Sequence, residues 1–114
     1  MEGTPKMGSD TMIAEERVLC RNPDPEKQGT RIPRWKYELV RDAIVSALQT
    51  RPEGFPFRDL PTQVRNRLTG DDARAVGSIS WHTTVIKLDL EARGTIERIR
   101  EARPQLLRIV ATDR

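Results

Sequence analysis

The sequence predicts an α+β domain in which three helices are followed by a C-terminal β-hairpin. In three separate segments, apolar residues recur at intervals of three and four positions, and this spacing is typical of helices with one buried face. After the third segment, a glycine precedes two short stretches rich in Ile and Leu, which predict paired strands. With 114 residues and 36% hydrophobic content, the chain has enough apolar side chains for one modest core.

The first helix is predicted over Trp35 to Thr50. Pro33 suits its start because the φ angle of proline is already helical. Apolar residues at i, i+3 and i+4 spacing predict its buried face, which consists of Tyr37, Val40, Ala43, Ile44, Ala47 and Leu48. After a turn, Phe55 to Phe57 is expected to be extended and to pair with the later hairpin.

The second helix is predicted to begin at Asp59 and to stop at Gly70. An Asp side chain can accept hydrogen bonds from the free amides of a helix start, and Pro61 is tolerated in the first turn. The apolar stripe of this helix consists of Leu60, Val64 and Leu68. Residues 71–77 are then expected to form a polar connection that is longer than the tight turn of a minimal helix-turn-helix and has room for a short helical turn.

The third helix is predicted over Ser80 to Arg93. Ser80, or Ser78 just before it, can cap the first amides, and Gly94 can adopt the left-handed conformation that ends a helix. Two apolar stripes run along it: Ile79, Thr83, Ile86 and Leu90 form one, and Trp81, Val85, Leu88 and Ala92 form the other. Because a small domain usually buries one stripe of each helix, the second stripe is either a binding surface or a second buried side.

The hairpin is predicted from Thr95 to Arg100 and from Gln105 to Val110, and Glu101 to Pro104 forms its loop. We expect Ile96, Leu107 and Ile109 to face the core. Residues 1–33 are expected to form an extended N-terminal arm, partly disordered, before a domain that covers residues 34–114. In this arm, Met1 to Thr11 is excluded from the fold, and Glu16 to Cys20 is an apolar run that could join a sheet edge or cover the Trp81, Val85 and Leu88 stripe.

Several classes of protein are disfavoured by composition. The sequence has no apolar run near the roughly 20 residues that cross a bilayer and no leader, so we expect a cytoplasmic protein without a membrane partner. One Cys and one His are too few for a disulfide framework or a Cys/His zinc site within one chain. His82 has Asp89 as its one nearby acidic partner, and no glycine-rich phosphate loop is present. We therefore expect no enzyme, no metal, no cofactor and no small-molecule substrate.

The run from Leu90 to Ile96 resembles the junction at which the third helix of winged helix-turn-helix domains enters its hairpin, or wing. The resemblance implies that Leu90 and Ile96 point inward. It also implies that the outward face of the helix, which reads the major groove in DNA-binding members, carries Trp81, Thr84, Val85 and Leu88.

A second resemblance covers most of the chain. Lys36-Tyr37-Glu38 with Arg41, the helix that contains Trp81, and the run from Thr84 to Gly94 are similar to a family of small bacterial proteins of unknown function. This resemblance implies a winged-helix-like fold, and it implies no catalytic residues.

Two functions agree with these patterns. The first is binding of double-stranded DNA, as in a transcriptional regulator, because the excess of positive charge lies in residues 58–114, which hold eleven basic and eight acidic side chains. The residues expected to contact DNA are Thr84, Lys87, Arg93, Arg98, Arg100 and Arg103. The second is protein interaction, either as a homodimer or with another protein, through Trp81, Val85 and Leu88, because groove-reading faces are usually polar.

Overall fold

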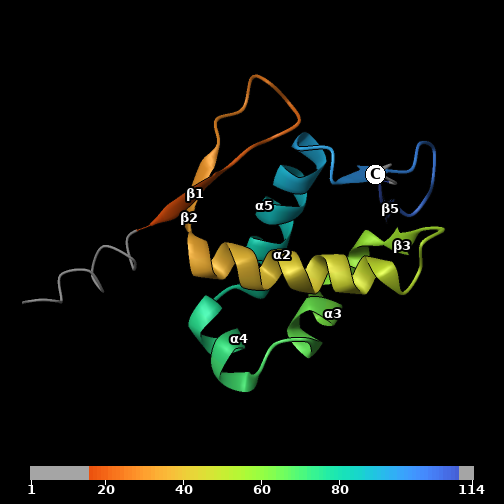
Figure 1. Cartoon of the computed structure of the whole chain (residues 1–114). Helices are drawn as coiled ribbons and strands as arrows, with labels where there is room; N and C mark the ends of the chain where they lie inside the picture. Colours follow the sequence, from red (N-terminus) through yellow and green to blue (C-terminus); the bar gives the residue numbers. More distant parts are fainter. Residues whose placement is uncertain (1–15, 111–114) are drawn as a thin grey trace, which may run out of the picture.

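Residues 16–110, the part of the chain that the computed structural model describes, form an α+β fold, as the sequence predicts (Figure 1). In chain order the elements are β1 (Arg17–Cys20), β2 (Thr30–Pro33), α2 (Arg34–Gln49), β3 (Phe55–Pro56), the 3-10 turn η1 (Phe57–Asp59), α3 (Leu60–Asn66), α4 (Gly70–Val76), α5 (Ile79–Ala92), β4 (Ile96–Arg98) and β5 (Leu106–Ile109). Within this part of the chain, no helix is long and apolar enough to cross a membrane.

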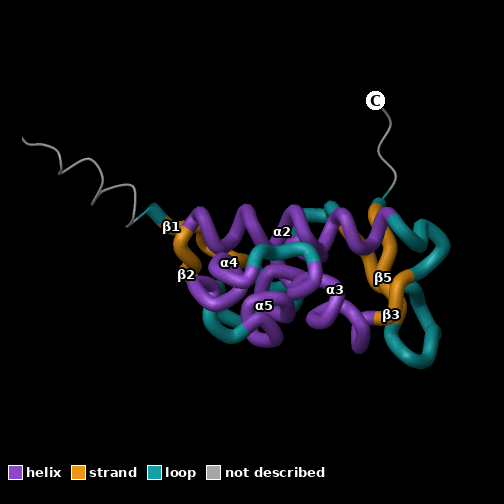
Figure 2. The backbone as a smooth tube through the Cα atoms, turned by 90° about the horizontal axis from the view of Figure 1, so that it is seen from below, coloured by secondary structure: helices purple, strands orange, loops and turns teal. Residues whose placement is uncertain are grey.

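Helix α2 is the element against which the rest of the fold packs. It contacts α3, α5, β5 and both strands of the N-terminal hairpin, and Figure 2 shows it along one side of the molecule with the shorter helices beneath it. All six apolar residues predicted for its buried face are buried. The 3.6-residue period was therefore sufficient to identify its face, because a single apolar stripe had to meet the core.

The segment predicted as one helix from Asp59 to Gly70 differs from that expectation. Helix α3 ends at Asn66, and Asp59 makes no capping hydrogen bond. Gly70 begins α4 instead of ending α3, and the Thr69 side chain caps α4 by accepting a hydrogen bond from the Asp72 amide at 3.0 Å. Two Asp side chains in the first turn also favour a helix start at this point, since they complement the positive end of the helix dipole.

Helix α5 follows the sequence prediction closely. Ser78 caps it by accepting a hydrogen bond from the Trp81 amide at 3.1 Å, and Gly94 has a φ of +80° directly after its end. Leu90 is buried, whereas Trp81 keeps 48% of its surface exposed. The expectation that Leu90 points inward and Trp81 outward is thereby confirmed.

The C-terminal sheet has the strand order β3-β5-β4, and both pairings are antiparallel. Phe55 pairs with Leu107, as expected for the extended piece before α3, and Ile96 pairs with Ile109. Phe55, Ile96 and Leu107 are buried, and Ile109 packs at the edge of the core. This sheet therefore closes the core at one end of α2.

The N-terminal segment forms a second sheet, in which β1 pairs with β2 in antiparallel register. The sequence did not predict β2. Val18, Cys20 and Ile32 are buried in the same core as α2 and α5. This hairpin lies beside the C-terminal part of α5, and Trp81 stays exposed, so the described segment does not cover the Trp81, Val85 and Leu88 stripe. The expectation for Met1 to Thr11 concerns residues outside the described range.

Candidate functional site

The outward face of α5 carries two exposed side chains and two that are partly buried. Trp81 and Thr84 are exposed, and Leu88 is partly buried. Val85 is also partly buried and packs against the edge of the core. The ring of Trp81 meets His82 edge to face, with 4.8 Å between the ring centroids. The resulting surface is apolar at its centre and includes one free hydroxyl group, at Thr84.

Lys87 does not lie on this face. Its side chain is buried, its Nζ lies 2.5 Å from a carboxylate oxygen of Glu91, and it also lies 4.8 Å from the centroid of the Phe57 ring. A buried ammonium group needs such a partner because an unpaired charge is costly in the protein interior. This placement corrects the expectation of a DNA contact, since the ammonium group has no access to a phosphate.

Arg93 is also occupied by contacts within the protein. Its Nε donates a hydrogen bond to Asp89 at 2.8 Å, and its Nη2 donates to the Leu19 carbonyl at 3.2 Å. The hydrogen bond to Asp89 raises the pKa of Arg93 above its ordinary value, so the guanidinium stays charged. The side chain keeps 36% exposure and connects α5 to β1.

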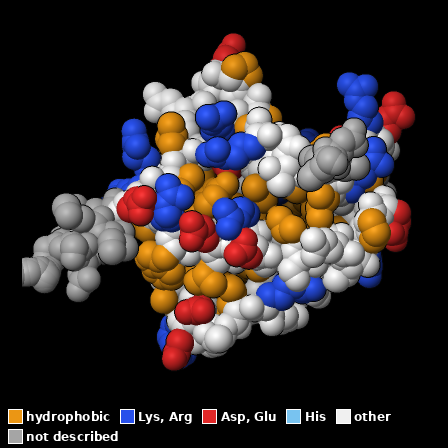
Figure 3. All heavy atoms as spheres, in the orientation of Figure 1, with side chains coloured by type: hydrophobic (Ala, Val, Ile, Leu, Met, Phe, Trp, Pro, Cys, Tyr) orange, Lys and Arg blue, Asp and Glu red, His pale blue; other side chains and the backbone are white. Residues whose placement is uncertain are grey.

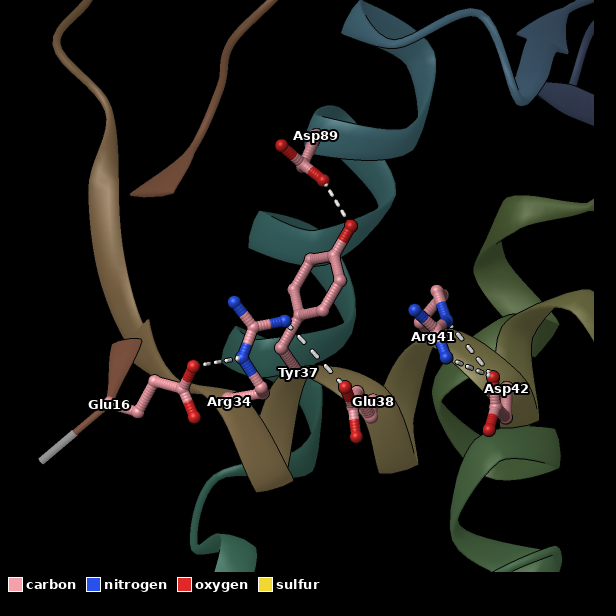
Figure 4. A network of polar contacts seen from close by, with 7 residues as sticks. All are labelled: Glu16, Arg34, Tyr37, Glu38, Arg41, Asp42 and Asp89. Carbon is pink, nitrogen blue, oxygen red and sulfur yellow. Dashed lines mark hydrogen bonds and ion pairs between the residues drawn. The ribbon is translucent and has the colours of Figure 1, made fainter. Parts of the chain in front are cut away.

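Asp89 is the acceptor at the centre of this network. Its carboxylate is fully buried and also accepts hydrogen bonds from the Tyr37 hydroxyl at 2.5 Å and from the Arg21 amide at 2.8 Å. Figure 4 shows Tyr37 of α2 pointing directly at Asp89 of α5. Three segments that are distant in the sequence thus meet at one carboxylate.

Two neutral groups adjoin this carboxylate. Burial, and then the nearby charge of Asp89, raises the pKa of the Cys20 thiol to about 12. Burial and the hydrogen bond to Asp89 raise the pKa of Tyr37 to about 12 as well. Both groups therefore stay protonated at neutral pH, and Cys20 lacks the thiolate that a nucleophile requires.

The β4–β5 hairpin carries several exposed basic residues. Arg98, Arg100 and Arg103 are exposed, and Arg98 has an acidic neighbour, Glu91, at 3.6 Å. Arg108 is paired with Glu97 at 2.6 Å across the two strands. Within residues 16–110, Arg100 and Arg103 form no ion pair. Of the six residues expected to contact DNA, Lys87 is buried and Arg93 is exposed but paired with Asp89. Thr84, Arg98, Arg100 and Arg103 are exposed.

His82 does not pair with Asp89. Its Nδ1 lies 2.7 Å from the Ser78 carbonyl of the preceding turn, an arrangement in which Nδ1 donates the hydrogen bond. Among residues 16–110, no three His, Cys, Asp or Glu side chains are grouped so that they could hold a metal ion.

The sequence reasoning missed one further feature, a surface pocket lined by Arg34, Arg41 and Arg93, which we call the arginine pocket. Figure 3 shows Lys and Arg side chains gathered beside α5 and over the N-terminal half of α2, interleaved with Asp and Glu. The signal available in the sequence was the seven-residue spacing of Arg34 and Arg41, which places both on one face of a helix. The contribution of Arg93 required the tertiary structure.

Comparison with known proteins gives one match. No curated protein and no solved structure matches the chain. Residues 17–107 match the profile of a family of unknown function, DUF6958, and this range includes β1, the arginine pocket and most of the C-terminal sheet. The match covers most of the chain and agrees with the resemblance seen in the sequence, so the chain belongs to the DUF6958 family.

Proposed function

We propose that this protein is a non-catalytic winged-helix module that binds double-stranded DNA. The order of α2, α3 and α5 followed by the β4–β5 hairpin supports the winged-helix assignment, in which the hairpin is the wing and β3 adds a third strand to it. Helix α4 is then an addition in the connection between the second and third helices of the pattern.

The observation that carries the proposal is the exposure of Arg100 and Arg103 on the wing without an ion-pair partner in the described chain. A guanidinium group can donate two parallel hydrogen bonds to a phosphate, and most contacts between proteins and DNA are made to the backbone. Arg98 would add a third contact from the same hairpin, and the Thr84 hydroxyl on α5 would approach a phosphate or a base edge.

The proposal is tested by fluorescence anisotropy with a labelled duplex of mixed sequence. Affinity should fall steeply between about 50 and 200 mM salt, because phosphate contacts release bound counterions. The double variant Arg100→Gln/Arg103→Gln should bind about tenfold more weakly and show a salt slope smaller by about 2.

The matched control is Arg31→Gln/Arg74→Gln, which removes the same charge from exposed positions in β2 and α4. We expect its affinity for the duplex to remain close to that of the unmodified protein. Equal weakening by both double variants would show that only net charge matters, and binding that does not depend on salt would reject the proposal.

A second candidate function is protein interaction through the outward face of α5, and the exposure of Trp81 favours it. Lys87 and Arg93 are both occupied by internal contacts, so this face has fewer free basic groups than a groove-reading helix usually presents. If the partner is a second copy, Leu88→Asp should reduce the mass measured by sedimentation equilibrium from dimer to monomer. Leu19→Asp, at an exposed apolar position on β1, is the control and should leave the mass unchanged.

A further inference from the structure

We propose that the arginine pocket binds the phosphoryl group of a small phosphorylated molecule. The pocket lies where α2, β1 and the C-terminal end of α5 meet, and its charged lining consists of Arg34, Arg41 and Arg93. Three guanidinium groups at one site match an anion that has several oxygen atoms, because each can donate hydrogen bonds in a fixed fork.

Carboxylates hold two of these arginines from α2 in place. Arg34 has its Nε 3.2 Å from Glu16 and its Nη1 3.7 Å from Glu38. Arg41 has its Nε and Nη2 each 2.9 Å from Asp42. Figure 4 shows both arrangements beside Tyr37. These contacts reduce the side-chain freedom that binding would otherwise remove, so the guanidinium groups are partly preorganised.

Each arginine retains unused hydrogen-bond donors. A guanidinium has five N–H groups, and among the contacts of residues 16–110 the Nη2 of Arg34 and the Nη1 of Arg41 and Arg93 have no partner. The three side chains are between 36% and 45% exposed, so each presents part of its surface to solvent. Held at one side and free at the other, the three groups can accept an anion without losing their present partners.

The rest of the lining fits a ligand larger than phosphate alone. Within residues 16–110 no carboxylate lines the pocket, whereas Thr95 adds a hydroxyl group, and Val18 and Leu90 add apolar surface. The cavity volume is about 370 Å³, which lies within the usual range of small-molecule sites. The expectation of no small-molecule substrate rested on the lack of a catalytic grouping and of a glycine-rich loop in the sequence. Arg93 is far from Arg34 and Arg41 along the chain and joins them only in the folded protein.

This pocket is separate from the surface proposed to bind DNA. The residue of α5 in the DNA surface is Thr84. Arg93 follows it by nine residues, or about two and a half turns, and therefore lies on the opposite side of the helix. The arginine pocket therefore does not depend on the proposed function, and the two can fail independently.

The test is isothermal titration with inorganic phosphate and with adenosine monophosphate, at an ionic strength kept constant with sodium chloride. Both probes should bind saturably to one site. Arg41→Gln should weaken the binding of each about tenfold, the loss expected for one charge-assisted contact. Arg74→Gln removes the same charge from an exposed pair on α4 and should change affinity less than twofold.

Two further measurements locate the site. In amide NMR spectra, phosphate should shift the signals of Arg34, Arg41, Arg93 and Thr95, and Arg41→Gln should retain the dispersed spectrum of a folded protein. The wing variant Arg100→Gln/Arg103→Gln should bind phosphate normally. Binding that does not saturate, equal loss in Arg41→Gln and Arg74→Gln, or displacement of adenosine monophosphate by duplex DNA would overturn the proposal.

Discussion

Asp89 is the residue at which the buried polar contacts of this protein converge. Its carboxylate is fully buried and accepts hydrogen bonds from the Tyr37 hydroxyl, the Arg21 amide and the Arg93 guanidinium. A buried charge is tolerated when it is paired and its hydrogen-bonding capacity is used, and both conditions are met here. The same contacts join β1, α2 and α5, so Asp89 positions one wall of the arginine pocket.

Replacing Asp89 with Ala should lower the free energy of unfolding by about 3 to 5 kcal/mol, because Arg93 and the Tyr37 hydroxyl lose their buried acceptor. Urea denaturation followed by circular dichroism measures this change. The control is Asp71→Ala, which breaks an exposed ion pair with Arg74 and should have little effect. Equal losses in the two variants would contradict the structural role assigned to Asp89.

Cys20 should make the stability of the protein sensitive to alkaline pH. Its pKa rises from an ordinary value of 9.0 to about 12 on folding, so the folded state holds a proton that the unfolded chain releases above pH 9. The corresponding stabilisation is complete below pH 9 and is lost as the pH rises to about 12. Urea denaturation at pH 8 and pH 11 should show a smaller decrease in Cys20→Ala than in the unmodified protein. An equal decrease in both would show that the thiol makes no contribution.

At the scale of elements, the backbone conformation at the start of α5 decides which of two serines caps the helix. The sequence offered Ser78 and Ser80 as caps, and the backbone of Ser78 is extended while Ser80 is already inside the helix. An N-cap residue needs an extended conformation so that its side chain can reach the amide three residues later, and Ser78 does so.

Ser78→Ala should therefore destabilise the protein by about 1 kcal/mol, the usual effect of removing a helix cap. Ser80→Ala is the matched control, and because Ala favours helix interiors it should leave stability unchanged or slightly higher. The midpoints of thermal unfolding of the two variants give the comparison. If Ser80→Ala lost more stability than Ser78→Ala, the assignment of the cap to Ser78 would be contradicted.

For the whole molecule, the described part of the N-terminal segment belongs to the same core as the helices. Val18, Cys20 and Ile32 are buried against α2 and α5, while the Leu19 carbonyl and the Arg21 amide complete the contacts of Arg93 and Asp89. The sequence-based division at residue 33 therefore separates segments that share buried surface and one polar network.

A shortened chain that contains residues 34–114 should lose cooperative unfolding, because it exposes apolar core surface and leaves Asp89 with fewer hydrogen bonds. Thermal unfolding measured by near-ultraviolet circular dichroism would show a broad transition or none. The point variant Arg31→Gln, at an exposed position in β2, should unfold cooperatively like the full chain. If the shortened chain kept the thermal unfolding midpoint of the full chain, residues 34–114 would be a domain that folds without the N-terminal segment.

Several elements could be predicted because their signals are local. The apolar period of α2 and of α5 follows from residues close together in the sequence. The pairing of Phe55 with Leu107 of β5 is long-range, and it was expected because an extended piece before α3 can add a strand to the later hairpin. The strand β2 was missed, and the boundary between α3 and α4 was misplaced, because Gly70 was expected to end the second helix. Pro33 was interpreted only as a helix start, so the four-residue strand β2 that ends at this proline was not predicted. Gly70 was interpreted as a helix end because glycine is common there, but it begins α4.

The sequence by itself determined the α+β class, the buried face of α2 and the membership of the DUF6958 family. Which of the two apolar stripes of α5 faces outward was decided by the tertiary structure. Only the tertiary structure decided which charged side chains are free. Lys87 is buried and paired with Glu91. Arg93 keeps an exposed side, but it is paired with Asp89 and also reaches a carbonyl 74 residues away. Periodicity shows which side of a helix is apolar, whereas the partner of each charge depends on segments that folding brings together.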